Sequence, residues 1–220
     1  MQMETKTAMI AGSTGLIGSL LLEELLKDDD YSEVQIWVRN TGHIANPKLK
    51  EILVDYTVTD RLPLQLPDHV FCCLGTTIRT AGTKEAFRRV DFELVKDLAK
   101  RAERSGSEKF LVVSSLGANA SSGNFYLKTK GEMEEAVKSC RIPSIFIFRP
   151  SMLLGKRKEF RLGELIGKGV MKAVGFMLLG SLRKYRGIEA ADVAKAMVKM
   201  AKEDSKGVLI LESDELARNT

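Results

Sequence analysis

The stretch MIAGSTGLIGSLLLEELL, residues 9–26, places three glycines at three-residue spacing between a short apolar run and a helix-like one. Glycine adopts positive φ and lets a backbone approach a ligand closely, and the N-terminus of a following helix attracts a pyrophosphate. The pattern Gly12-x-x-Gly15-x-x-Gly18 therefore favours a dinucleotide-binding turn. A glycine-rich strand-to-helix connection without a ligand is the alternative, which the glycines alone do not exclude.

Apolar runs alternate with segments of helical periodicity along most of the chain. The strand candidates are apolar at nearly every position, as in a parallel sheet that helices cover on both faces. We therefore expect an α/β fold with a doubly wound parallel sheet. The expected strands are 7–12, 34–39, 51–56, 69–75, 109–115, 144–150 and 207–213, and the expected helices are 16–29, 84–104, 126–139 and 188–203.

Length and composition suit one domain, because 220 residues with 44% hydrophobic side chains can bury a full core. We expect a single nucleotide-binding domain over 1–220, in which 151–187 forms a small substrate-side lobe. The formal charge of +5 suits a phosphate-bearing ligand but is too small to indicate nucleic acid, so no nucleic-acid partner is expected. The oligomeric state stays open.

The cysteines and the N-terminal residues bear on the cellular compartment. Cys72, Cys73 and Cys140 include no CxxC pair, so we expect buried thiols in a reducing compartment and no metal site. The first residues lack a charged-then-apolar leader, and no run of 18 apolar residues is present. These patterns predict a cytoplasmic protein without an ordinary spanning helix.

Two residues at expected strand ends bear on the nucleotide. Proteins that read the ribose of NAD usually carry Asp or Glu about 20 residues after the glycine turn. Arg39 stands there instead, and a guanidinium pairs with a 2′-phosphate that a carboxylate would repel. This favours NADP(H) over NAD(H), although a surface arginine at a strand end is the alternative. Asp55 could accept a hydrogen bond from the adenine amino group or serve as a turn residue.

A candidate catalytic set follows the fifth expected strand. Tyr126 and Lys130 are four residues apart and share one face of a helix, where an ammonium near a phenol suits acid/base chemistry. Ser114 and Ser115 end the strand, and a serine there can donate a hydrogen bond to a substrate carbonyl oxygen. The carboxyl ends of parallel strands are where such sheets bind ligands, so the combination indicates one site.

This set resembles the extended and atypical short-chain dehydrogenase/reductases. It is most similar to the Tat-interacting oxidoreductase family of NADPH binders, and the similarity covers nearly the whole chain in order. The segments that carry it are CCLGTT (72–77), RRVDFELVKDLAK (88–100), VVSSLGA (112–118), YLKTKGEMEE (126–135) and FRPSMLLG (148–155).

The resemblance implies roles for individual residues. It implies that Tyr126 and Lys130 are the acid/base pair and that Ser115, rather than Ser114, contacts the substrate. The implied cofactor contacts are Thr14, Gly15, Leu16 and Ile17 at the phosphates, Arg39 at the 2′-phosphate, Leu74 and Gly75 near the adenosine, and Leu153 and Arg161 at the nicotinamide end.

The chain departs from the family pattern at two positions. Asn40 stands where some relatives have a second arginine, which weakens the preference for NADP. Asp91 stands where many short-chain reductases have asparagine, which puts a proton relay of their type in question.

Residues 156–186 differ in character from the rest of the chain. They hold nine Lys or Arg and two Glu residues, a net charge of +7, around an apolar run of 14 residues. That run is too short to span a membrane. We expect a helix that covers the cofactor, with a peripheral membrane contact or a dimer contact as alternatives.

Two functions fit these observations. The first is an NADP-dependent oxidoreductase, or an epimerase-like enzyme, that acts on a small carbonyl or alcohol substrate through Ser115, Tyr126 and Lys130. The second is a non-catalytic NADPH-binding regulator that acts through protein partners.

Overall fold

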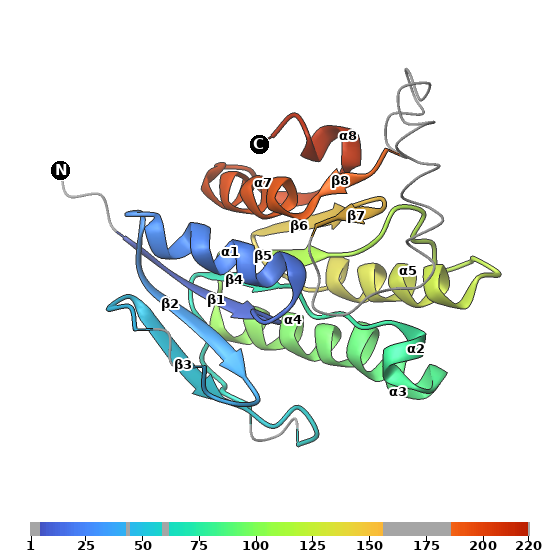
Figure 1. Cartoon of the computed structure of the whole chain (residues 1–220), viewed down its shortest axis with the longest axis horizontal. Coiled ribbons are helices and arrows are strands. Elements are labelled where there is room, and N and C mark those ends of the chain that lie inside the picture. The colour runs from blue at the N-terminus through green and yellow to red at the C-terminus, as the bar shows by residue number, and fades with distance from the viewer. Residues whose placement is uncertain (1–4, 43–44, 59–61, 156–185, 220) are drawn as a thin grey trace.

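The computed structural model describes residues 5–42, 45–58, 62–155 and 186–219. Its centre is a seven-stranded sheet in the order β3-β2-β1-β4-β5-β6-β9, with every neighbouring pair parallel (Figure 1). The expected doubly wound fold is therefore confirmed. The strands are β1 (Lys6–Ala11), β2 (Tyr31–Val38), β3 (Leu49–Leu53), β4 (His69–Cys72), β5 (Lys109–Val113), β6 (Ser144–Arg149) and β9 (Gly207–Glu212).

Helices cover both faces of the sheet (Figure 1). On one face α1 (Leu16–Lys27) and α7 (Ala190–Lys202) pack against Ala8 and Ile10 of β1. On the other face α4 (Leu94–Ser105) and α5 (Phe125–Lys138) pack in the core that holds Met9 and Ala11. Successive side chains of β1 thus enter opposite cores, which explains why the strand is apolar at consecutive positions.

The chain order creates a switch point between β1 and β4. From β1 the chain builds outward through β2 and β3, then returns to place β4 on the opposite side of β1. The loops that follow β1 and β4 therefore diverge to opposite faces of the sheet. In open α/β sheets, ligands bind in the crevice that forms at the carboxyl ends of such strands.

Several short elements differ from the sequence-based expectation. The single helix expected over 84–104 is divided into α3 (Lys84–Arg88), the π-helical turn η2 (Arg89–Glu93) and α4. The structure also contains α2 (Ile78–Ala81), α8 (Ser213–Leu216) and a two-stranded sheet of β7 (Leu153–Leu154) and β8 (Ile188–Glu189), none of which was expected.

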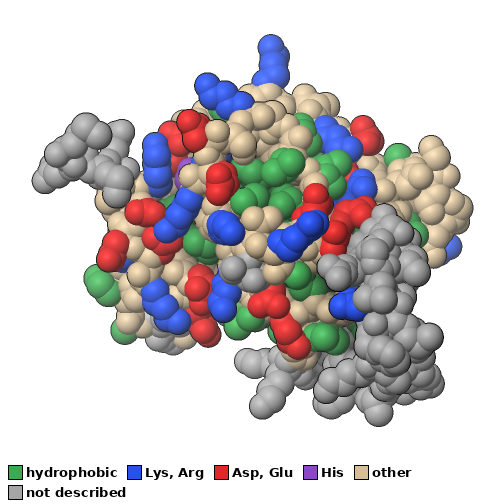
Figure 2. Space-filling model, turned by 90° about the horizontal axis from the view of Figure 1, so that it is seen from above, with side chains coloured by type: hydrophobic (Ala, Val, Ile, Leu, Met, Phe, Trp, Pro, Cys, Tyr) green, Lys and Arg blue, Asp and Glu red, His purple; other side chains and the backbone are tan. Residues whose placement is uncertain are grey.

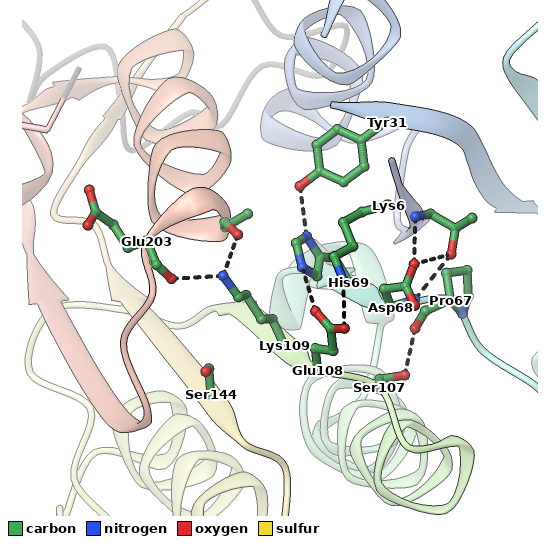
Figure 3. Close-up of polar contacts among 12 residues, drawn as sticks. Lys6, Tyr31, Pro67, Asp68, His69, Ser107, Glu108, Lys109, Ser144 and Glu203 are labelled. Atoms are coloured by element: carbon green, nitrogen blue, oxygen red, sulfur yellow. Dashed lines mark hydrogen bonds and ion pairs between the residues drawn. The ribbon is translucent and has the colours of Figure 1, made fainter. Parts of the chain in front are cut away.

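A polar cluster ties together the amino ends of the strands, opposite the crevice (Figure 3). The Tyr31 hydroxyl and His69 Nδ1 form a hydrogen bond of 2.9 Å, and His69 Nε2 lies 3.7 Å from a carboxylate oxygen of Glu108. Lys6 Nζ donates to the other oxygen of Glu108 at 2.8 Å. Burial lowers the pKa of His69 to about 4, so the imidazole is neutral at pH 7.

The face above α1 and α7 carries both signs of charge, with Lys and Arg interspersed among Asp and Glu (Figure 2). An ion-pair group joins the C-terminal ends of α1 and α7, because Lys202 Nζ lies 2.7 Å from carboxylate oxygens of both Asp28 and Asp30. Across the described ranges, no helix combines the length and apolarity needed to cross a membrane.

Three expectations concern residues that the structure does not describe. The lobe expected over 151–187 and the basic, apolar segment 156–186 fall largely on 156–185, outside the described residues, and so does Arg161. The roles predicted for them stay predictions.

The three cysteines are free thiols: Cys72 and Cys140 are buried and Cys73 is half-buried.

Candidate nucleotide-binding and catalytic site

The three glycines of the turn after β1 have different surroundings. Gly12 has φ 87°, and a Cβ there would lie 2.7 Å from the carbonyl carbon and oxygen of Cys73. A Cβ on Gly18 would overlap the carbonyl oxygen of Gly12. Gly15 is exposed, and its Cβ would meet only that oxygen, at 3.3 Å. Gly12 and Gly18 are thus required by packing, whereas Gly15 leaves open the surface that a ligand would approach.

The N-terminus of α1 has the properties of an anion seat. Its N-cap residue is Gly15, it has no side-chain cap, and its first turn holds no acidic residue. By contrast Thr77, Thr83 and Asn124 cap α2, α3 and α5 through their side chains. The first N–H groups of a helix lack intrahelical partners and attract negative charge. An uncapped helix start at the switch point therefore fits a pyrophosphate.

Side chains around this turn divide into those that pack and those that face outward. Ile17 is buried, and Leu16 packs against the core and lies 3.2 Å from the position of a Gly155 Cβ. Thr14 is exposed. Ser13 Oγ is buried and has no hydrogen-bond partner among the described residues. Leu16 and Ile17 could thus line a phosphate only through their backbone, while Ser13, which sequence reasoning missed, offers an unsatisfied hydroxyl.

The residues expected near the adenosine follow neighbouring strands. Arg39 is exposed directly after β2, and the Val54 N–H donates to the Val38 carbonyl at 2.9 Å, so the ends of β2 and β3 stay paired. Asp55 Oδ1 accepts from the Thr57 N–H at 2.8 Å, which shows the turn role that the sequence left open.

Leu74 and Gly75 begin the loop after β4. Leu74 is half-buried against the α4/α5 core, and Gly75 is exposed. Like Arg39 after β2 and Asp55 after β3, these two residues lie on a loop at the carboxyl edge of the sheet. The residues expected to contact the adenosine therefore all follow strands in the same half of the sheet.

Tyr126 and Lys130 lie on the first two turns of α5. Tyr126 is half-buried, and its ring centroid is 5.6 Å from that of Phe87 in α3. Lys130 is 96% buried, with Nζ 2.7 Å from Asp91 Oδ1. Burial is the largest single influence on the pKa of Lys130 and would lower it, but the charge and hydrogen bond of Asp91, together with Tyr126 and Cys72, hold the pKa above its ordinary value. The lysine is therefore an ammonium at physiological pH.

The two serines after β5 have different partners. Ser114 is buried and donates through Oγ to Glu134 Oε1 at 2.5 Å. Glu134 also accepts two hydrogen bonds from Arg149, at 2.9 and 2.5 Å. Ser115 is half-buried, and among the described residues its Oγ makes only a long contact, 3.4 Å, with the Leu116 carbonyl oxygen. Ser114 thus belongs to a structural network, and Ser115 is the serine better able to reorient toward a substrate.

A cavity of about 690 Å³ lies beside β8, α7 and α8. It is lined by charged groups of both signs, Arg186, Glu189, Asp192, Asp214 and Arg218 among them. No pattern in the sequence singled out these residues together, because they come from segments about 25 residues apart. Leu153, expected at the nicotinamide end, pairs in β7 with Ile188 of β8 and so lies next to this region.

Comparisons with known proteins agree with this geometry. The chain matches the family described as NAD(P)H-binding over residues 12–204. It is 34% identical over 205 residues to the protein FMP52, mitochondrial, of Debaryomyces hansenii, covering 90% of this chain and 88% of that protein. It is 35% identical over 172 residues to protein HTATIP2 of Rattus norvegicus, covering 76% of this chain and 71% of that protein.

A solved structure shares the fold. UDP-glucuronic acid 4-epimerase from Bacillus cereus, in complex with NAD, superposes with a TM-score of 0.67 at 17% identity and covers 95% of this chain and 78% of its own. At that identity the likeness extends to the fold alone.

The expectation of a cytoplasmic protein is wrong. Relatives in Debaryomyces hansenii, Candida albicans and Scheffersomyces stipitis carry the designation mitochondrial, which conflicts with it. The expectation relied on the missing secretory leader and the missing spanning helix. Neither feature bears on import into mitochondria, which uses amphipathic, arginine-rich segments.

Proposed function

Because this chain belongs to the NAD(P)H-binding family, as an atypical short-chain dehydrogenase/reductase close to HTATIP2, we propose that it is an NADP(H)-dependent oxidoreductase. Its substrate would be a small carbonyl or alcohol compound, with epimerase-like chemistry included. One observation carries the proposal: the uncapped N-terminus of α1 and the buried Lys130 ammonium lie at the same edge of the sheet, on either side of the loop that holds Gly75.

The residues present fit the cofactor. The start of α1 supplies free N–H groups for the pyrophosphate, with Thr14 and Gly15 exposed beside them. Arg39, exposed after β2, would pair with the 2′-phosphate. Leu74 and Gly75 would contact the adenosine side from the loop after β4. Bound NADP(H) would supply the hydride chemistry.

Three side chains would handle the proton and the substrate oxygen. Tyr126 would exchange a proton with the carbonyl or alcohol oxygen. Lys130 would hold a positive charge next to the phenol and donate to the nicotinamide ribose. Ser115 would donate a hydrogen bond to the oxygen as negative charge develops on it.

The test is calorimetric titration with NADPH and NADH, for the wild type and two arginine variants. Arg39→Ala should weaken NADPH binding about 10- to 100-fold while NADH binding changes little, since a hydrogen bond to a charged group is lost for one ligand only. Arg141→Ala is the matched control, because Arg141 lies in the loop before β6, at the opposite edge of the sheet, with 95% of its side chain exposed. Equal losses for both nucleotides in Arg39→Ala would overturn the preference for NADP(H).

A panel of carbonyl compounds then tests catalysis. Oxidation of NADPH by any member would support the enzymatic proposal. Tight cofactor binding without oxidation across the panel would overturn it and favour the non-catalytic regulator.

A further inference from the structure

The ion pair between Lys130 and Asp91 is the least expected feature of the site. Both side chains are almost fully removed from solvent, with 4% of Lys130 and 1% of Asp91 exposed. Nζ lies 2.7 Å from Asp91 Oδ1, while Oδ2 accepts the Thr76 N–H at 2.8 Å. Burial of two charges is expensive, and a well-packed apolar pair often serves stability as well or better. A role beyond stability would explain why this pair is charged.

The π-helical turn places Asp91 where it is. One extra residue per turn in η2 changes the direction of its side chains relative to α3 and α4, and such turns are frequent at functional sites. Two arginines hold the start of the turn. Arg88 pairs with Glu132 of α5, and Arg89 donates to the Thr57 carbonyl, at 2.9 Å, in the loop after β3.

The pair lies directly beneath the loop that would contact the cofactor. A Cβ on Gly75 would stand 3.5 Å from Asp91 Oδ1 and 3.9 Å from Lys130 Nζ. Thr76, the next residue, is the backbone donor to Asp91. One carboxylate therefore connects the ammonium of α5 to the loop after β4.

We propose that Asp91 is a positioning residue for the oxidoreductase site: it fixes the Lys130 ammonium beneath Gly75, keeps it charged and points its remaining donors toward the cofactor ribose. The inference rests on the proposed function. An ammonium has three N–H donors, and among the described residues its one ion-pair partner is Asp91. The others remain for ligand hydroxyls.

A carboxylate at position 91 can keep the Lys130 amine protonated, whereas a neutral amide could not. The groups that face Lys130 are Asp91 of η2, Tyr126 of its own helix and Cys72 of β4. Burial raises the pKa of Cys72 to about 12, so this thiol carries no charge at physiological pH. Among these three groups, Asp91 is the one carboxylate, and it lies 2.7 Å from Nζ. With asparagine in its place, burial would favour the neutral amine and the site would lose its charge as the pH rises.

The test compares Asp91→Asn, Asp91→Glu and Asp97→Asn by NADPH titration from pH 6 to pH 10. Asparagine keeps an oxygen for the Thr76 N–H but removes the charge. We expect Asp91→Asn to bind NADPH about tenfold more weakly at neutral pH and to lose further affinity toward pH 10, where wild-type affinity stays level. Asp97→Asn is the matched control, because Asp97 pairs with Arg101 on α4 and should leave both quantities unchanged.

The glutamate variant separates charge from position. Asp91→Glu keeps Lys130 charged but displaces it, so its affinity should fall while the profile stays level. If Asp91→Asn does not fold, the loss of affinity in Asp91→Glu still tests the proposal. NADPH affinity and pH profile equal to wild type in either variant would overturn the proposal.

A second readout separates this inference from the proposed function. The ¹³C signal of the Lys130 Cε, assigned with Lys130→Met, reports protonation of the amine without cofactor or substrate. We expect it to titrate at lower pH in Asp91→Asn than in wild type. An unchanged titration would overturn the role of Asp91 even if the enzyme is active, and an inactive wild type with the expected titration would overturn only the proposed reaction.

Discussion

Gly18 is packed against Gly12 so closely that a Cβ on Gly18 would overlap the carbonyl oxygen of Gly12 and lie 2.9 Å from its carbon. The glycine spacing therefore brings α1 onto the turn, independently of any ligand. Gly18→Ala should lower the free energy of unfolding by about 3 kcal/mol, as overpacking does, or prevent folding. Urea unfolding measures this.

Gly15→Ala is the companion substitution, because Gly15 has φ −77° and a Cβ there would meet only the Gly12 oxygen at 3.3 Å. We expect a change in unfolding free energy within about 1 kcal/mol, together with weaker NADPH binding, since the new methyl group would stand in the anion seat. Normal NADPH affinity in Gly15→Ala would argue against a pyrophosphate at this turn.

The central strands β1, β4, β5 and β6 were predictable because they are buried on both faces and so are apolar at consecutive positions, whereas the edge strands β3 and β9 are largely half-buried or exposed. All seven expected strands exist, and β1 at Lys6–Ala11 differs by one residue from the expected 7–12. The family resemblance drawn from the motifs is confirmed as well. Apolar runs and short motifs can be read from neighbouring residues in the sequence. The arrangement of consecutive strands and helices then follows because crossover connections between parallel strands are right-handed.

What could not be predicted depends on contacts between distant residues. Helical periodicity over 84–104 does not reveal the π-helical turn, which shifts the helix face by a single residue. The pairing of Asp91 with Lys130 joins residues 39 positions apart, and no pattern in the sequence predicted it, although the departure from asparagine marked Asp91. Two-residue strands such as β7 and β8 are too short to show any period. The roles expected for Arg39, Ser115 and Tyr126 stay predictions.

His69 should make stability depend on pH in a defined window. Folded His69 has a pKa of about 4 because it is buried, whereas an unfolded histidine titrates near 6.5. Between these values the unfolded state binds the extra proton, so stability is full above about pH 6.5 and falls as the pH drops toward 4, by on the order of 3 kcal/mol. Urea unfolding of His69→Phe from pH 7 to pH 4.5 should show a shallower slope than wild type. Equal slopes would exclude His69 as the group responsible.

Glu134 should contribute strongly to stability through its charge. It is 1% exposed and accepts hydrogen bonds from Ser114 and Arg149. Glu134→Gln removes the buried charge that Arg149 donates to and leaves its guanidinium, among the described residues, only the more distant ion pair with Glu212, at 4.0 Å, so we expect a loss of about 3 kcal/mol in urea unfolding. Glu135→Gln is the control on the next residue, since the Glu135 side chain is 66% exposed and its change should stay within about 0.5 kcal/mol. Similar losses in both variants would show that the network adds little.

Tyr126→Phe should separate catalysis from binding. The phenyl ring can keep the contact with Phe87, so the free energy of unfolding and NADPH affinity should change little, while kcat on the carbonyl compound found in the panel should fall at least about 100-fold because the proton donor is lost. Tyr31→Phe is a control with the opposite expected result, a loss of stability without a loss of kcat. The Tyr31 hydroxyl bonds to His69 at the far edge of the sheet, so its removal should reduce stability by about 1 kcal/mol and leave kcat unchanged. If Tyr126→Phe retains wild-type kcat, the proton must come from another group, and the role proposed for the Lys130 charge beside the phenol would be excluded as well.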